Sequence, residues 1–136
     1  MEVGSFFPQT PETVWRVLTD PDLLERWLMC SVGFAATTGT HFIFVLPTKP
    51  PGEIACEVLT ARPNQQLTYT WFDLRAQPPA RWVVDWTIQP QGRGTRFLLT
   101  QTGFDIDNRR QKMARNAMER GWRSTLLRLR ELLDTL

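Results

Sequence analysis

The feature that most constrains this chain is a long helical pattern at its end, preceded by a series of short strand-like segments. Residues 108–136 contain no proline, and apolar residues recur there every three or four positions, as on one face of a helix. These apolar residues are Ala114, Met118, Trp122, Leu126, Leu129, Leu133 and Leu136. Residues 40–102 instead alternate apolar and polar residues between turn-like segments, which is typical of antiparallel strands. The sequence therefore predicts one long helix lying against a sheet.

The order of the predicted elements defines the fold class. Strands are predicted at residues 3–7, 40–46, 53–61, 66–73, 81–89 and 95–102, with turns at 47–52, 62–65 and 90–94 and a proline-rich loop at 74–79. Two short helices follow the first strand, because Thr10-Pro11 and Asp20-Pro21 each place a capping residue before a proline suited to the first helical position. The second helix ends near Trp27, and residues 28–39 carry no clear pattern. This order predicts an α+β fold with the helices on one side of a curved antiparallel sheet of about six or seven strands.

Size and composition narrow the class of protein further. With 136 residues, the chain fits one domain over residues 1–136. The net charge is only +2, which gives no reason to expect a nucleic-acid partner. The chain holds 6 Trp and 8 Phe against 1 Tyr and 1 His, which is more aromatic bulk than a small core needs. Either aromatic rings fill a bulky core or they line a cavity, and both alternatives stay open.

The location of the protein is expected to be cytoplasmic. The N-terminal residues lack the basic and apolar regions of a signal peptide, and no segment approaches the roughly 20 apolar residues of a membrane span. The two cysteines, Cys30 and Cys56, have no metal-ligand spacing and are expected to be reduced thiols.

Few side chains are candidates for catalysis. His41 is the only histidine, which excludes a serine-histidine-aspartate triad or a cluster of histidine metal ligands. Glu53 and Glu57 share one face of a predicted strand, which we expect to be solvated. Cys56 is expected to point inward as a small apolar residue. The chain has no glycine-rich phosphate loop, cysteine cluster or serine nucleophile motif, and the sequence therefore predicts no metal or other cofactor.

Two further expectations concern charge and backbone. Asp85 should point outward and pair across strands with Arg81 or Arg96. Gly121 interrupts the long helix just before Trp122, where it is expected to permit a bend or a close approach of another element. The basic residues of this helix are mixed with acidic ones, which is typical of a solvated face.

The candidate site is the set of inward-facing side chains between the sheet and the long helix. Alternation on the strands and helical spacing place nine side chains on this inner face, and these nine are the candidates for ligand binding. They are Phe42, Phe44, Tyr69, Trp71, Trp86, Phe97, Gln101, Met118 and Trp122. Trp82 is predicted to face the same way. Flat aromatic rings can wall a cavity, and Gln101 is a candidate for orienting a ligand through hydrogen bonds.

The chain resembles a known superfamily along nearly its whole length. The matching segments are residues 11–15, 19–21, 52–54, 57–58, 66–71, 94–97 and 100–104, together with Trp27 and Gly121-Trp122. Their order is similar to that of the helix-grip fold of the START-like, birch-pollen-allergen-like (SRPBCC) superfamily. Within it, the chain most resembles the homologues of the activator of heat-shock-protein-90 ATPase. One departure is that Leu28 follows Trp27, where the family often has a second aromatic residue.

The resemblance implies a hydrophobic cavity between the sheet and the last helix, but no common activity. The first hypothesis is non-catalytic binding of a lipophilic small molecule in this cavity. The second is a cyclase-type or hydrolase-type enzyme that uses the same cavity, which the scarcity of inward acid–base groups disfavours. The third, suggested by the family name, is a regulatory protein that interacts with a chaperone. A protein partner and a homodimer are left open.

Overall fold

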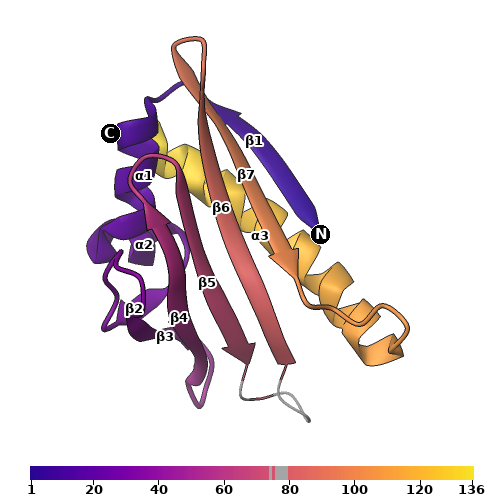
Figure 1. Cartoon of the computed structure of the whole chain (residues 1–136). Coiled ribbons are helices and arrows are strands. Elements are labelled where there is room, and N and C mark those ends of the chain that lie inside the picture. Colours follow the sequence, from indigo (N-terminus) through magenta and orange to yellow (C-terminus); the bar gives the residue numbers. More distant parts are fainter. Residues whose placement is uncertain (74, 76–79) are drawn as a thin grey trace.

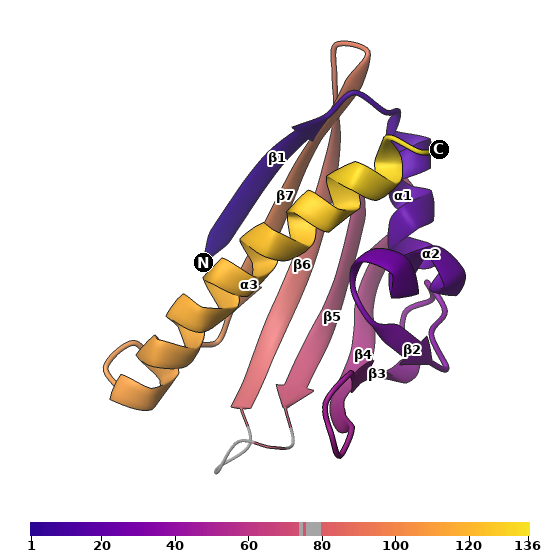
Figure 2. The same cartoon turned by 180° about the vertical axis from the view of Figure 1, so that it is seen from behind.

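A single antiparallel sheet wraps around the long C-terminal helix (Figures 1 and 2). The computed structural model describes residues 1–73, 75 and 80–136, and these form seven strands in the order β1-β7-β6-β5-β4-β3-β2. The strands are β1 (Glu2–Phe7), β2 (Cys30–Val32), β3 (His41–Leu46), β4 (Gly52–Arg62), β5 (Gln66–Asp73), β6 (Ala80–Gln91) and β7 (Gly94–Thr102). The α+β helix-grip prediction is confirmed, and β2 is the strand within the segment that had no clear pattern.

Two short helices begin at the predicted capping residues. Helix α1 (Pro11–Thr19) starts after Thr10, whose hydroxyl accepts a hydrogen bond from the Thr13 amide. Helix α2 (Pro21–Trp27) starts after Asp20, whose carboxylate accepts one from the Asp22 amide. Asp20 also ends α1, because its own amide donates to the Arg16 carbonyl. One residue therefore serves both helices and fixes the angle between them.

The long helix α3 (Arg109–Leu133) begins after Asn108, whose side chain accepts hydrogen bonds from two amides of the first turn. The prediction that the helix continues to residue 136 is wrong at its end, since Leu136 lies beyond the last turn and is exposed. No helix among the described residues is both long and apolar enough to cross a membrane.

The hairpin between β6 and β7 is tighter than predicted. The sequence placed a loop at residues 90–94, but Pro90 and Gln91 still pair with Thr95 and Gly94. The turn consists of Gly92 and Arg93, and Gly92 has a φ of 58°, which glycine adopts without strain. The predicted loop at residues 74–79 lies outside the described residues, except for Arg75.

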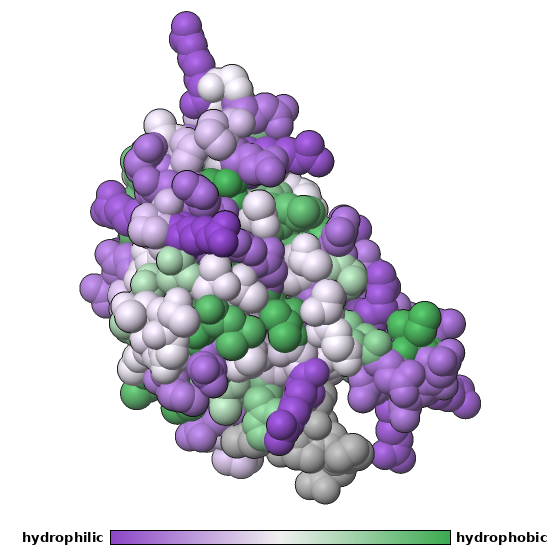
Figure 3. Space-filling view, in the orientation of Figure 1, coloured by the Kyte–Doolittle hydropathy of each residue, from purple (hydrophilic) through white to green (hydrophobic). Residues whose placement is uncertain are grey.

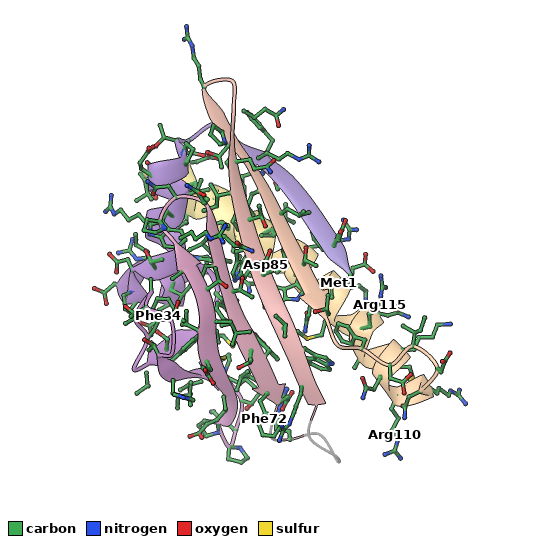
Figure 4. The ribbon with its side chains drawn as sticks, in the orientation of Figure 1. Met1, Phe34, Phe72, Asp85, Arg110 and Arg115 are labelled. Carbon is green, nitrogen blue, oxygen red and sulfur yellow. The ribbon has the colours of Figure 1, made fainter. Side chains whose placement is uncertain are left out.

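The outer face of the sheet carries Asp85 on β6 (Figure 4). The predicted pairing of Asp85 with Arg81 or Arg96 is wrong. Its carboxylate instead accepts hydrogen bonds from the side chains of Gln66, Thr68 and Thr87. Neutral donors from β5 and from its own strand lie closer to it, so that Arg81 is free to lie over the ring of Phe72, 4.7 Å from its centre.

Gly121 does not admit a neighbouring element into α3. It is exposed, and a Cβ atom built on it would meet no described atom within 4 Å beyond its chain neighbours and the backbone of its own helix. The expectation of a close approach at this position is therefore wrong. The residue has no packing reason to be glycine.

Replacing Gly121 with Ala should stabilise the protein by about 1 kcal/mol, because alanine loses less backbone entropy than glycine in a helix interior. For a chain of this length the midpoint of thermal unfolding should rise by about 3 °C. Differential scanning calorimetry of Gly121→Ala checks this, and a lower midpoint would mean that the helix needs glycine here.

Candidate ligand-binding site

The C-terminal half of α3 is joined to the sheet by a layer of aromatic side chains. Trp122 meets Trp71 of β5 edge to face at 5.5 Å between ring centres, and Trp86 of β6 at 5.4 Å. Trp86 in turn stacks on Phe97 of β7 at 5.4 Å. The α3 backbone lies close to β1, α1 and α2, whereas these rings span the distance to the middle of the sheet. Contacts between rings thus connect this half of the helix to the sheet.

Hydrogen bonds fix the orientation of the central rings. The Trp86 indole N–H donates to the Tyr69 hydroxyl at 2.8 Å, and the Trp122 indole N–H donates to Gln101 Oε1 at 2.6 Å. All four side chains are buried. Because buried donors and acceptors are satisfied in pairs, each ring has one preferred position.

The remaining predicted residues lie on the same inner face. The ring centres of Phe42 and Phe44 on β3 lie 5.2 Å apart. Both rings contact that of Tyr69, at 5.4 and 5.9 Å between ring centres. Of the nine predicted residues, Met118 alone is only partly buried. All nine therefore face the space between the sheet and the helices, and their contact with a ligand stays a prediction.

The N-terminal half of α3 extends beyond the sheet (Figures 1 and 2). Its inward side carries Ala114 and Met118, which are only partly buried, as is Phe104 in the loop before the helix. Arg110, in the first turn of the helix, projects away from the sheet (Figure 4). Hydrophilic side chains cover most of the visible surface of this end of the helix (Figure 3). The aromatic layer is thus closed at the C-terminal half of α3 and incompletely covered at the other half.

Two buried N–H groups at this end have no hydrogen-bond partner among the described residues. They are Gln101 Nε2 on β7 and Trp82 Nε1 on β6, and the two side chains are 0% and 6% exposed. The Trp82 ring is held by stacking on Phe104, 4.7 Å between centres. Sequence reasoning placed Trp82 on the inner face through the alternation of β6 but did not assign it to the site.

The titratable groups of the inner face are held in their neutral forms. Burial raises the pKa of the Cys56 thiol to about 12. Burial also raises the pKa of the Tyr69 hydroxyl above its ordinary value, with a smaller contribution from Cys56. The residues that the structure describes include no group of three or more His, Cys, Asp or Glu side chains placed to hold a metal ion.

The two cysteines should therefore differ sharply in reactivity. Cys30 is exposed and Cys56 is buried with a raised pKa, so a thiol reagent at pH 8 should modify one thiol per folded chain rapidly and the second only on unfolding. Titration with a disulfide reagent, with and without denaturant, measures this. Rapid release of two equivalents from the folded protein would contradict the burial of Cys56.

A curved antiparallel sheet that wraps around a long C-terminal helix, with an aromatic layer between them, defines a START-like helix-grip protein with the SRPBCC fold. More narrowly, the sequence matches the model of the family described as Activator of Hsp90 ATPase homolog 1-like protein over residues 8–134. The chain belongs to that family. No curated protein matches it.

Solved structures agree with this assignment. Protein MLL2253 from Mesorhizobium loti is 37% identical, with a TM-score of 0.87, and the match covers 99% of this chain and 96% of that one. DynU16, from the dynemicin biosynthetic locus, is 21% identical with a TM-score of 0.84, over 99% of this chain and 47% of that one. CalU16 from Micromonospora echinospora is 19% identical with a TM-score of 0.76, over 97% of this chain and 74% of that one. The last two likenesses show the fold alone.

Proposed function

We propose that this protein binds a lipophilic small molecule, without transforming it, between the inner face of the sheet and the N-terminal half of α3. The observation that carries the proposal is the incomplete cover at this end. Met118 and Ala114 on the helix and Phe104 before it are apolar and only partly buried beside the aromatic layer. A lipophilic molecule that covers them gains roughly 25 cal/mol for each Å² of apolar surface removed from water.

The chemistry of the inner face favours binding over catalysis. An acid–base catalyst works best when the pKa of its group lies near the working pH. Cys56 and Tyr69 both have pKa values raised far above neutrality, so neither serves as a base there. Gln101 does not titrate. The titratable side chains described on this face therefore supply no proton acceptor near pH 7, which ranks the enzymatic alternative lower.

The test is to fill the proposed site with a larger side chain on α3. Met118→Trp should block this site and abolish quenching of the native tryptophan fluorescence by a panel of neutral lipophiles. The fold should tolerate the change, because Met118 is only partly buried. Native mass spectrometry of the unmodified protein should show a complex with at least one member of the panel.

The matched control is Met113→Trp, because Met113 is 62% exposed and lies on the same helix. Met113→Trp should bind as the unmodified protein does. If no lipophile binds the unmodified protein, or if Met118→Trp binds as well as the control, the proposal is wrong. A chaperone or other protein partner and a homodimer remain predictions.

A further inference from the structure

We propose that the ligand carries a neutral hydrogen-bond acceptor, such as the carbonyl oxygen of a ketone, ester or lactone. This acceptor takes hydrogen bonds from the side-chain N–H groups of Gln101 and Trp82 that have no partner among the described residues. This inference rests on the proposed function and adds the chemical class of the ligand. It follows from how the two donors are oriented, where they lie relative to each other, and what charge surrounds them.

The side-chain amide of Gln101 is held so that its nitrogen is a hydrogen-bond donor. Its oxygen accepts the indole N–H of Trp122 at 2.6 Å, so the other end of the amide, Nε2, has to be a donor. Gln101 is fully buried, and Nε2 has no partner among the described residues. A buried donor without a partner is costly and rare in native proteins. Trp122 therefore acts as a positioning residue that presents the Nε2 donor to the interior.

Trp82 lies on the same face of the sheet as this donor, on the neighbouring strand. Gln101 of β7 lies opposite Val84 of β6, and Trp82 is two residues from Val84, so both side chains lie on the same face. Diagonal neighbours of this kind lie about 7–8 Å apart, which is within the reach of long and aromatic side chains. Stacking on Phe104 holds the indole of Trp82. Both unpaired atoms are donors, so the partner they lack is an acceptor.

The charge around the two donors favours a neutral group on the ligand. Amide and indole N–H groups are neutral, and burying a carboxylate against neutral donors costs far more than burying a carbonyl. The nearby partly buried guanidinium of Arg115 is already paired with Glu119 at 3.0 Å. The Met1 amino group donates to the main-chain carbonyl of Gln101 in the strand ladder. These cations are engaged elsewhere, which favours a neutral acceptor.

The experiment compares three probes that share one ring system: dimethylaminonaphthalene, the same molecule bearing an acyl ketone, and the same molecule bearing a carboxylate. Fluorescence titration gives each dissociation constant. The ketone should bind about tenfold more tightly than the parent naphthalene, since two neutral hydrogen bonds contribute about that much. The carboxylate should bind no more tightly than the parent.

Trp82→Phe isolates one donor while keeping an aromatic ring against Phe104. No protein hydrogen bond is lost, because the indole N–H has no partner among the described residues. The preference for the ketone over the parent should fall from about tenfold to about threefold, and the bound ketone should emit at shorter wavelength. Trp15→Phe on α1 removes an indole elsewhere and should leave the preference intact.

Equal affinity for ketone and parent, or an unchanged ketone preference in Trp82→Phe, would overturn this inference. Tighter binding of the carboxylate than of the ketone would overturn the neutral character of the acceptor. Parent binding that Met118→Trp abolishes would leave the proposed function standing in either case, so the two failures are distinguishable.

Discussion

Replacing Gly94 with Ala should destabilise the protein by about 3 kcal/mol, which lowers the midpoint of thermal unfolding by about 10 °C. Gly94 is buried at the start of β7, where the chain between β1 and α1 crosses it. A Cβ atom there would overlap the carbonyl oxygen of Phe7 and lie 2.7 Å from the ring of Phe6 and 3.1 Å from the Pro8 backbone. Two of these three neighbours are backbone atoms, which do not turn aside as a side chain does. Chemical denaturation of Gly94→Ala measures the loss.

The matched control is Gly4→Ala on β1, where the nearest atoms to a new Cβ lie at 3.8 Å, an ordinary contact. Its unfolding free energy should change by less than about 1 kcal/mol. The same substitution thus has opposite signs at Gly94 and Gly121. A Gly94→Ala variant as stable as the control would show that β1 does not approach β7 as described.

The second large effect is expected from Trp86→Ala, which should cost about 4 kcal/mol of unfolding free energy. Trp86 is fully buried and its ring contacts those of Trp27, Phe97 and Trp122. Its removal leaves a cavity among rings that hydrogen bonds and stacking hold in place, and the Tyr69 hydroxyl loses its donor. Urea denaturation followed by circular dichroism, which does not depend on tryptophan emission, measures the loss.

Trp15→Ala is the control for Trp86→Ala, because Trp15 lies on α1 and is only partly buried. It should cost less than half as much. This comparison also decides between the two alternatives that composition left open around Trp86. A loss below about 1 kcal/mol would mean that the ring borders an empty space, whereas a large loss means that rings fill the interior.

Much of the fold could be predicted because its signals are local. A capping side chain and a following proline act within one turn, so Thr10 and Asp20 marked both short helices. Alternation depends on the geometry of a single strand, and it assigned the inner faces of β3 to β7. Predictions failed where the surroundings of a residue depend on an element that is distant in the sequence. The partners of Asp85 come largely from β5, and the surroundings of Gly121 depend on where α3 lies relative to the sheet.

The candidate site shows the same boundary between local and distant signals. The pattern could indicate that Gln101 and Trp122 face inward, but not that they bond to each other and so leave one amide nitrogen unpaired. That fact depends on two residues, one on a strand and one on a helix, that lie 21 positions apart in the chain. The unpaired indole of Trp82 likewise emerges only once its surroundings are known.

Under the proposed function, the extension of α3 beyond the sheet places part of the ligand contact outside the half of the helix that is packed in the core. The C-terminal half of α3 carries Trp122, Leu126 and Leu129, which are buried, whereas most side chains of the first three turns are exposed. Substitutions in those first turns cost little stability, because exposed positions tolerate change. Under the proposed function, substitutions at this end of α3 can change the ligand preference of the protein while the aromatic layer at the other end keeps the fold intact.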